Sequence, residues 1–376
     1  MLLLSGPNIC GNEWKYVKDC LDTGWVSSVG SYVDQFEKMS AAFAGTKYAV
    51  ATSSGTTALH ICLIMTGIGS GDYVITPNIT FIATCNSIKY TGAEPIFIDT
   101  DEHSWQMDLH LLEEFLENET EQRDGNCHYK ADGKRIPAIM PVHVLGNMCN
   151  IDRLLALAEK HNLLVIEDST EALGSYYKDR HAGSFGTLGT FSYNGNKIIT
   201  TGGGGMIVTD DETLARKAKH LTTQAKSDPF EYIHDEIGYN YRLVNVAAAM
   251  GVAQMELLPQ FIKRKKEIIS YYKQALAGIG DIDFQDVAEE VNPNWWLPTI
   301  KTNRQRDVLK VLNDKQMQSR PFWVPMNQLR MFRDNIYFHK NDRSDFVYRH
   351  CLSIPCSTNI TDGQLEAVSK TIREIF

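Results

Sequence analysis

The chain has 376 residues, of which 43% are hydrophobic and 22% charged, ordinary values for a globular protein. Its formal net charge of −9 disfavours nucleic acid as the main partner, although a phosphorylated ligand needs only a local cluster of donors. The eight cysteines include no Cys-x-x-Cys pair, and no stretch approaches the roughly 18 apolar residues of a membrane helix. We therefore expect a soluble, cytoplasmic protein with free thiols, no metal site and no membrane contact.

Short apolar segments alternate with helical patterns over the first two thirds of the chain. Helices are predicted at 12–21 and 31–43, then strands at 48–51, 73–76, 95–98, 138–142 and 163–167, with helices at 53–65, 81–90, 109–119 and 151–161 between them. The polar segment 118–135 interrupts this order and predicts a surface excursion. Such alternation predicts an α/β fold with a mainly parallel sheet covered by helices, and ligands beyond the carboxyl ends of its strands.

The last third has a different pattern. A charged helix at 210–221 leads into an apolar, alanine-rich segment at 244–257 and a long amphipathic helix at 261–276. A strand-like segment at 295–300, helices near 306–317 and 362–375 and a polar link at 327–345 then predict a smaller α+β domain. Because 376 residues exceed what one core usually serves, we expect a large domain over 1–250 and a small domain over 251–376.

One lysine, Lys197, stands between a polar turn at 194–196 and the glycine run 202–205. Most lysines are surface charges, but little other charge surrounds this one, and the glycines leave room for a second backbone or a flat ligand. Asp168 follows the apolar run 163–166 upstream. A carboxylate at a strand end and a lysine on the next segment are the two residues that a pyridoxal-phosphate site needs at least. The lysine forms a Schiff base and the aspartate keeps the pyridine nitrogen protonated.

Other candidate residues allow two interpretations each. The polar cluster 53–57 lies between a strand and a helix, where it favours an anion, but a plain helix cap explains the same residues. Phe81 could stack on a cofactor ring or belong to the core, and Glu171 could reach the same ligand or simply occupy a first helical turn. His143 fits a polar lining or a buried core histidine. The aromatic pairs 295–296 and 322–323 are most simply packing, but either could line a pocket for a sugar or base.

Seven ordered blocks carry a specific resemblance. They are TSSGTTAL (52–59), TPNITFIAT (76–84), PVHVLG (141–146), EDSTEALG (167–174), SFGT (184–187) leading into FSYNGNK (191–197), TTGGGGMIVT (200–209) and GYNYRL (238–243). In these blocks the chain resembles the DegT/DnrJ/StrS family of sugar aminotransferases, over essentially its whole length. The resemblance implies the fold-type I architecture of pyridoxal-phosphate enzymes, with a smaller C-terminal α+β domain.

The resemblance also implies a set of residues for pyridoxal 5′-phosphate. They are Lys197, which forms the Schiff base; Asp168, on the pyridine nitrogen; Gly55, Thr56 and Ser192, on the phosphate; Phe81, stacked on the ring; Glu171, near the ring hydroxyl; and Asn240 of the partner subunit, also on the phosphate. Lys197 and Asp168 would be the catalytic residues. A phosphate ligand from the neighbouring subunit implies a homodimer.

Two differences from the usual sequence pattern of this family make the predicted substrate class more specific. Asn194-Gly-Asn196 stands where many members carry a histidine, and Glu171 stands where others carry glutamine or histidine. This resembles the branch that makes 4-amino-4,6-dideoxy nucleotide sugars, such as perosamine and the legionaminic acid and bacillosamine precursors, for surface polysaccharide. The resemblance implies transfer of an amino group from L-glutamate to C4 of a nucleotide-diphosphate-linked 4-keto-6-deoxy sugar. Substrate contacts are expected from His143, Asn194, Arg242 and Trp323.

Two other functions fit the same fold, because folds are reused for different chemistry. One is a pyridoxal-phosphate-dependent sugar dehydratase, and the other is a regulator that binds the cofactor without catalysis. A sister branch of dehydratases lacks the lysine, so Lys197 favours transamination. The nucleotide, the sugar and the choice between C4 and C3 stay open.

Overall fold

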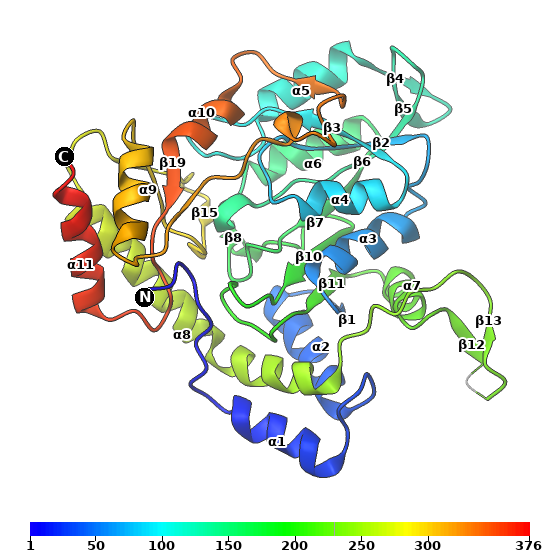
Figure 1. Cartoon of the computed structure of the whole chain (residues 1–376). Helices are drawn as coiled ribbons and strands as arrows, with labels where there is room; N and C mark the ends of the chain where they lie inside the picture. Colours follow the sequence, from blue (N-terminus) through cyan, green and yellow to red (C-terminus); the bar gives the residue numbers. More distant parts are fainter. Residues whose placement is uncertain (229) are drawn as a thin grey trace.

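The computed structural model describes residues 1–228 and 230–376 and is shown in Figure 1. Two helices, α1 (Glu13–Thr23) and α2 (Ser31–Ala44), come first. The alternating part follows as β1 (Tyr48–Thr52), α3 (Gly55–Met65), β2 (Asp72–Pro77), α4 (Ala83–Tyr90), β3 (Glu94–Ile98), α5 (Leu109–Asn118), β6 (Arg135–Ile139), α6 (Ile151–Lys160), β7 (Leu164–Asp168), β10 (Leu188–Ser192), β11 (Gly205–Thr209) and α7 (Glu212–Thr222). The predicted alternation of strands and helices is confirmed.

These strands form one large sheet in the order β1-β11-β10-β7-β6-β2-β3-β18. The pairs from β10 to β18 (Tyr337–Phe338) are parallel, whereas β11 runs antiparallel to both β1 and β10. Every residue of β2 and β11 is buried, as expected for central strands covered on both faces. Helices lie around the sheet in Figure 1, so the predicted α/β class with a mainly parallel sheet is confirmed.

The predicted surface excursion at 118–135 is confirmed, because most of its residues are exposed. It folds into a hairpin of β4 (Thr120–Arg123) and β5 (Asn126–Tyr129), and β5 joins the large sheet through β6. Its turn residues Asp124 and Gly125 both have positive φ, 50° and 76°, which suits a tight hairpin turn. The Asp-Gly signal was present in the sequence, but pairing with β6 depends on a contact between separate segments.

One long helix, α8 (Asn245–Ala275), replaces the two helical segments that the sequence indicates. Pro259 lies inside it and lacks the N–H that would continue the ladder. Buried Leu258 and Phe261 on either side hold the helix against the core, so packing compensates for the lost hydrogen bond. In Figure 1, α8 runs from beneath α2 to the region of α9 and α11.

The C-terminal third contains a separate four-stranded antiparallel sheet, ordered β14 (Asp283–Phe284), β16 (Thr299–Lys301), β19 (Cys351–Ser353) and β17 (Arg320–Pro321). The helices α9 (Gln305–Asp314), α10 (Arg343–His350) and α11 (Asp362–Arg373) accompany it. The smaller elements are β8 (Tyr176–Tyr177), β9 (Arg180–His181), β12 (Lys226–Asp228), β13 (Ile233–His234) and β15 (Val291–Asn292), with short 3-10 helices at Val144–Gly146 and Met326–Gln328. The polar link 327–345 contains β18, which returns to the edge of the large sheet beside β3.

The division into 1–250 and 251–376 stays a prediction. Its boundary falls within α8, which lies beside both parts of the chain. One hydrophobic cluster joins them, because it includes Phe36 of α2, Leu258 of α8 and Ile372 of α11. We propose that α8 is the element through which the two parts are connected.

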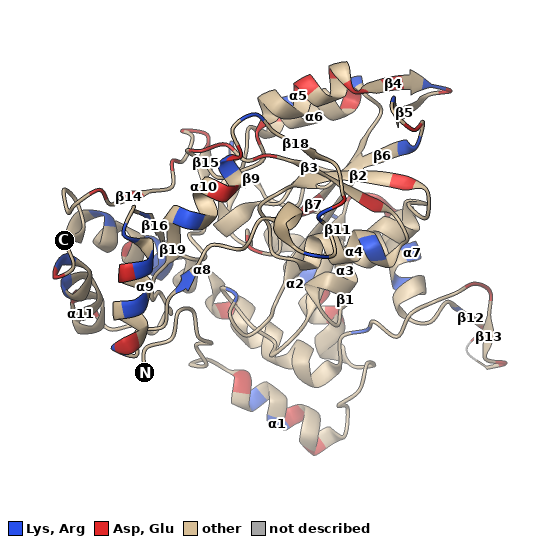
Figure 2. Ribbon diagram, turned by 45° about the horizontal axis from the view of Figure 1, so that its top comes forward, with Lys and Arg blue, Asp and Glu red and all other residues tan. Residues whose placement is uncertain are grey.

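Several general expectations can be compared with the structure. All eight cysteines are free thiols. Among the described helices, none is both long and apolar enough to span a membrane. Acidic and basic residues are interspersed on α1, α9 and α11 (Figure 2), as is usual for helix surfaces that face solvent.

Candidate active site

The carboxylate of Asp168 lies at the carboxyl end of β7, beside Thr190 of β10. The residue is 3% exposed. Thr84 donates a hydrogen bond from Oγ1 to Asp168 Oδ2 at 2.6 Å, and the backbone N–H of Thr170 donates to Oδ1 at 3.2 Å. These two hydrogen bonds fix the orientation of the Asp168 side chain.

Lys197 stands in the turn that leaves β10, and its side chain is 13% exposed. The Nζ atom is 3.9 Å from Glu171 Oε1 and 3.9 Å from the centroid of the Trp296 ring. Burial lowers the pKa of Lys197, because desolvation disfavours the ammonium, while Glu171 and Asp168 act in the opposite direction. The amine therefore loses its proton more readily than a surface lysine does.

Glu171 accepts a hydrogen bond at Oε2 from the backbone N–H of Leu145 at 2.8 Å. Burial raises the pKa of this carboxyl to about 7, against the opposing effect of Lys197. The 3.9 Å between Glu171 and Lys197 is too long for a hydrogen bond, so neither charge is fully compensated. An acid and an amine that both favour their neutral forms can exchange a proton near neutral pH.

The amino terminus of α3 supplies the anion-binding end of the site. Ser54 and Thr57 form a reciprocal capping box, so the plain-cap interpretation holds for these two residues. The N–H groups of Gly55 and Thr56 belong to the first turn, where they have no partner within the helix. Both residues line the main cavity together with Ser192. Helix dipole and free N–H groups there favour a phosphate.

Two glycines permit close packing at this end, against a backbone at Gly205 and against side chains at Gly55. A Cβ on Gly205 would lie 2.3 Å from the carbonyl oxygen of Ser54, and one on Gly55 would lie 2.9 Å from Ser192 Cβ. The approach of a second backbone, predicted from the glycine run 202–205, is therefore confirmed at Gly205.

A cavity of about 390 Å³ connects these groups. Of the predicted residues, Gly55, Thr56, Phe81, Ser192, Asn194, Lys197 and Trp323 line it. Phe81 is 53% exposed, so a flat ring has access to its side chain, and it meets Trp323 at a ring-centroid distance of 6.5 Å. Asp168 and Glu171 are buried beside the cavity rather than in its wall.

Three predicted residues are not brought to this cavity. His143 is fully buried, and its Nε2 bonds Glu167 Oε2 at 2.8 Å, which matches the core-histidine interpretation. The contact of His143 with substrate stays a prediction. Arg242 lines a second cavity of about 700 Å³, beside Trp25. Asn240 is exposed and pairs through its backbone with Thr223.

Trp296 contributes more than its sequence context indicated. Its indole N–H donates a hydrogen bond to the carbonyl of Asn196 at 2.7 Å, and its ring lies against Lys197 Nζ. Asn294 links the backbones of Trp296 and Glu171. Its Oδ1 accepts a hydrogen bond from the Trp296 N–H at 2.8 Å, and its Nδ2 donates one to the Glu171 carbonyl at 2.8 Å. The aromatic pair 295–296 suggested a pocket wall, but the contact with the lysine turn depends on tertiary packing.

These groups match what pyridoxal phosphate requires. Lys197 offers an amine for an aldehyde carbon, and Asp168 offers a buried carboxylate for a protonated ring nitrogen. The α3 terminus and Ser192 offer donors for a phosphate. The donor set therefore fits the group.

The comparison with known proteins decides the family. The model of the DegT/DnrJ/EryC1/StrS aminotransferase family matches residues 7–373. The chain belongs to this family. GDP-perosamine synthase of Escherichia coli O157:H7 is 37% identical to this family member, over 98% of this chain and 97% of its own length. The family makes the chain a pyridoxal-phosphate-dependent sugar aminotransferase, as the sequence resemblance predicts.

Solved structures support the same fold. DesI, solved in the presence of its TDP-sugar product, matches at 26% identity with a TM-score of 0.87, over 99% of this chain and 92% of its own. Spr1654 of Streptococcus pneumoniae, solved in a PLP form, matches at 23% identity with a TM-score of 0.88, over 99% of this chain and 97% of its own. The predicted fold-type I architecture is confirmed.

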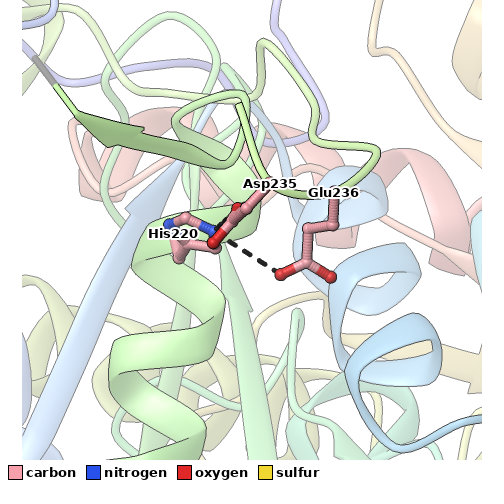
Figure 3. Close-up of side chains that lie close together, drawn as sticks. All are labelled: His220, Asp235 and Glu236. Atoms are coloured by element: carbon pink, nitrogen blue, oxygen red, sulfur yellow. Dashed lines mark hydrogen bonds and ion pairs between the residues drawn. The ribbon is translucent and has the colours of Figure 1, made fainter. Parts of the chain in front are cut away.

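One further group of side chains stands apart from the active site (Figure 3). His220 Nε2 is 2.7 Å from Asp235 Oδ1 and 3.5 Å from Glu236 Oε1. These ligand atoms lie close enough to hold a metal ion, and the two carboxylates are exposed. The ammonium of Lys217 also contacts Glu236 Oε1. We therefore interpret the group as an ion-pair cluster that connects α7 to the segment after β13.

Proposed function

We propose that this protein transfers an amino group from L-glutamate to C4 of a nucleotide-diphosphate-linked 4-keto-6-deoxy sugar, for surface polysaccharide or glycan synthesis. The observation that carries the proposal is the placement of Lys197 Nζ beside Glu171, next to a cavity whose opposite end is the α3 terminus. The names of two relatives, GDP-perosamine synthase and a protein with a TDP-sugar product, support a nucleotide sugar.

We assign the proton transfers to Lys197 and the electrostatic support to Asp168. Pyridoxal 5′-phosphate, when bound, supplies an electrophilic carbon and a ring that accepts electrons. Asp168 would face the ring nitrogen, because hydrogen bonds from Thr84 and Thr170 fix the orientation of its oxygens. Lys197 Nζ would take the α-proton of the donor and deliver it to the electrophilic carbon of the cofactor, which requires an amine whose pKa is lowered by burial. Glu171 accepts or supplies that proton near neutral pH.

Binding roles follow from position. Gly55, Thr56 and Ser192, which line the cavity, would hold the phosphate, and Phe81 would cover one face of the ring. Trp323 and Asn194 line the part of the cavity left for substrate.

We also propose a homodimer in which Asn240 of the partner subunit reaches the cofactor phosphate. Support comes from the exposed apolar side chains near Asn240, including Ile237 at 83% and Val244 at 41% exposure. Arg242 borders a second cavity rather than the first, and its buried Nε has no partner among the described residues, so we propose that it contacts a substrate bound by the other subunit.

The function is tested by incubating the holoenzyme with L-glutamate and a set of nucleotide-linked 4-keto and 3-keto sugars. The expected products are 2-oxoglutarate and a 4-amino sugar, measured by coupled assay and mass spectrometry. Glutamate alone should convert the cofactor absorbance, which neither a dehydratase nor a regulator would do. A deoxygenated sugar without 2-oxoglutarate would replace the proposal with the dehydratase alternative.

The shared site is tested by mixing two inactive variants, Asn240→Ala/Arg242→Ala and Lys197→Ala. A hybrid dimer would carry one intact site, so activity should return to about a quarter of wild type on random pairing. Hybrids shown by native mass spectrometry to have formed, yet remaining inactive, would contradict the shared site.

A further inference from the structure

The wall of the active-site cavity opposite the sheet is formed by the C-terminal antiparallel sheet. Strand β17 pairs with β19 so that Arg320 lies opposite Ser353, and both residues line the cavity. Phe322 and Trp323 continue this wall towards Phe81. Arg320 is thus a cation that the C-terminal sheet contributes to the cavity.

The charged residues that line the cavity are not balanced in sign. Among the described residues that line it, the cations are Lys197 and Arg320, and none is Asp or Glu. Lys197 has Glu171 beneath it at 3.9 Å, so its charge is partly compensated. Arg320 Nη1 donates only to neutral oxygens, the Ser319 carbonyl at 2.8 Å and Asn313 Oδ1 at 3.4 Å. The guanidinium therefore brings a positive charge to the cavity that no carboxylate of the described chain balances.

The substrates of the proposed function are anions, and they need a cation that is not otherwise engaged. Glutamate carries carboxylates and a nucleotide sugar carries a diphosphate. The α3 terminus is assigned to the cofactor phosphate, and Lys197 is the reacting amine. Among the described residues that line this cavity, that leaves Arg320, because Arg242 borders the second cavity. The planar fork of Arg320 matches the paired oxygens of a carboxylate or a phosphate.

We propose that Arg320 is the anion-binding residue that holds the carboxylate or phosphate oxygens of the substrate at the active site. The inference rests on the proposed function, because it names the side chain that recognises the charge of those substrates. Arg320 is an exposed side chain with neutral protein partners, so its replacement should leave the fold intact.

The test compares Arg320→Gln and Arg320→Lys with wild type in separate half-reactions. One half-reaction varies glutamate, and the other varies the nucleotide keto sugar with the aminated cofactor. Loss of a charged hydrogen-bond partner should raise the KM of at least one substrate about 10-fold or more, with less change in kcat. Arg320→Lys should recover part of the loss, because it keeps the charge but not the fork. Arg330→Gln, an exposed arginine ten positions onward that does not line the cavity, is the matched control.

Each outcome has a definite meaning. A raised KM for glutamate alone identifies a carboxylate as the ligand, and a raised KM for the sugar alone identifies the diphosphate. Increases in both mean that one guanidinium serves the two substrates in turn. If Arg320→Gln matches Arg330→Gln in both half-reactions while wild type is active, the proposal is overturned.

A binding measurement separates this result from failure of the proposed function. Calorimetry of the holoenzyme with 2-oxoglutarate and with GDP measures anion binding without turnover. If wild type aminates no nucleotide sugar but binds either anion, a loss of about 10-fold in affinity on Arg320→Gln still supports the anion site. Equal affinities in wild type and variant, or binding of neither anion by wild type, would overturn it.

Discussion

Replacing Glu171 by Gln should make the protein more stable at alkaline pH while damaging its proton transfer. The amide keeps an oxygen that can accept the Leu145 N–H, which now bonds Glu171 Oε2 at 2.8 Å. It removes a carboxyl whose pKa burial raises from 4.5 to about 7. Because the folded protein binds this proton more tightly than the unfolded chain does, wild-type stability falls as pH rises from about 4.5 to about 7.

The size of the effect follows from that pKa shift. It corresponds to at most about 3 kcal/mol of unfolding free energy, which wild type loses above pH 7. The variant keeps only part of this amount, because loss of Glu171 also lowers the pKa of Lys197. The two proteins should therefore be about equally stable at pH 4.5 and differ by up to that amount at pH 8.

Urea denaturation of the apoproteins at a series of pH values measures this difference directly. Glu366→Gln, on the exposed face of α11, controls for the loss of one negative charge from the surface. A Glu171→Gln variant that is less stable than wild type at pH 8, or a difference that does not vary with pH, would refute the reasoning.

The same substitution should also change the reactivity of Lys197. The Glu171 carboxylate, 3.9 Å away, stabilises the charged form of Lys197. Without it the pKa of Lys197 should fall, so the amine should lose its proton at lower pH. At an effective dielectric constant of about 20, the lost attraction is at most about 4 kcal/mol, or about three pH units. Covalent attachment of pyridoxal phosphate, trapped with borohydride, should show its pH midpoint lowered by one unit or more. An unchanged midpoint would mean that the two groups are not coupled.

Three further predictions concern single residues. Lys197→Ala should keep the melting temperature within a few degrees but lose the borohydride-fixed cofactor, and peptide mapping that finds the label on another lysine would reject the assignment. Asp168→Asn should keep the cofactor but lower the glutamate half-reaction by about 10- to 100-fold, as expected for a lost charged partner; stopped-flow rates near wild type would show that another group protonates the ring. Gly205→Ala should destabilise the fold by about 1–3 kcal/mol, because its Cβ would meet the Ser54 carbonyl at 2.3 Å. Gly195→Ala, with nothing within 4 Å, should be near neutral in the same denaturant titration.

Much of the large sheet was predictable because β1, β2, β3, β6 and β7 each carry a local signal. The sequences of β2 and β7 are short apolar runs, and the helices between them have apolar residues at helical spacing. Elements whose formation depends on distant partners were missed. Strand β18 lies in a polar link and exists because it pairs with β3, and α8 continues through Pro259 because the core holds both sides.

The chemistry of the site was also largely readable in the chain. Lys197, Asp168 and the glycine run 202–205 are distinctive where they stand, because a strand end and a glycine-flanked lysine have few structural uses. Positions along the chain indicate which strand end a residue occupies, and parallel strands bring such ends to one edge. The sequence by itself therefore determined most of the sheet and the cofactor class, and it indicated the amine that we propose as the reacting group.

Only the tertiary structure decided what surrounds that amine. Trp296 and Arg320 come from the C-terminal third and meet the cavity because that part packs against the sheet edge, which no local pattern specifies. Packing likewise buries His143 against Glu167 and places Arg242 in the lining of a second cavity. The raised pKa of Glu171 has the same origin, since it depends on the removal of water by distant segments rather than on neighbours in the chain.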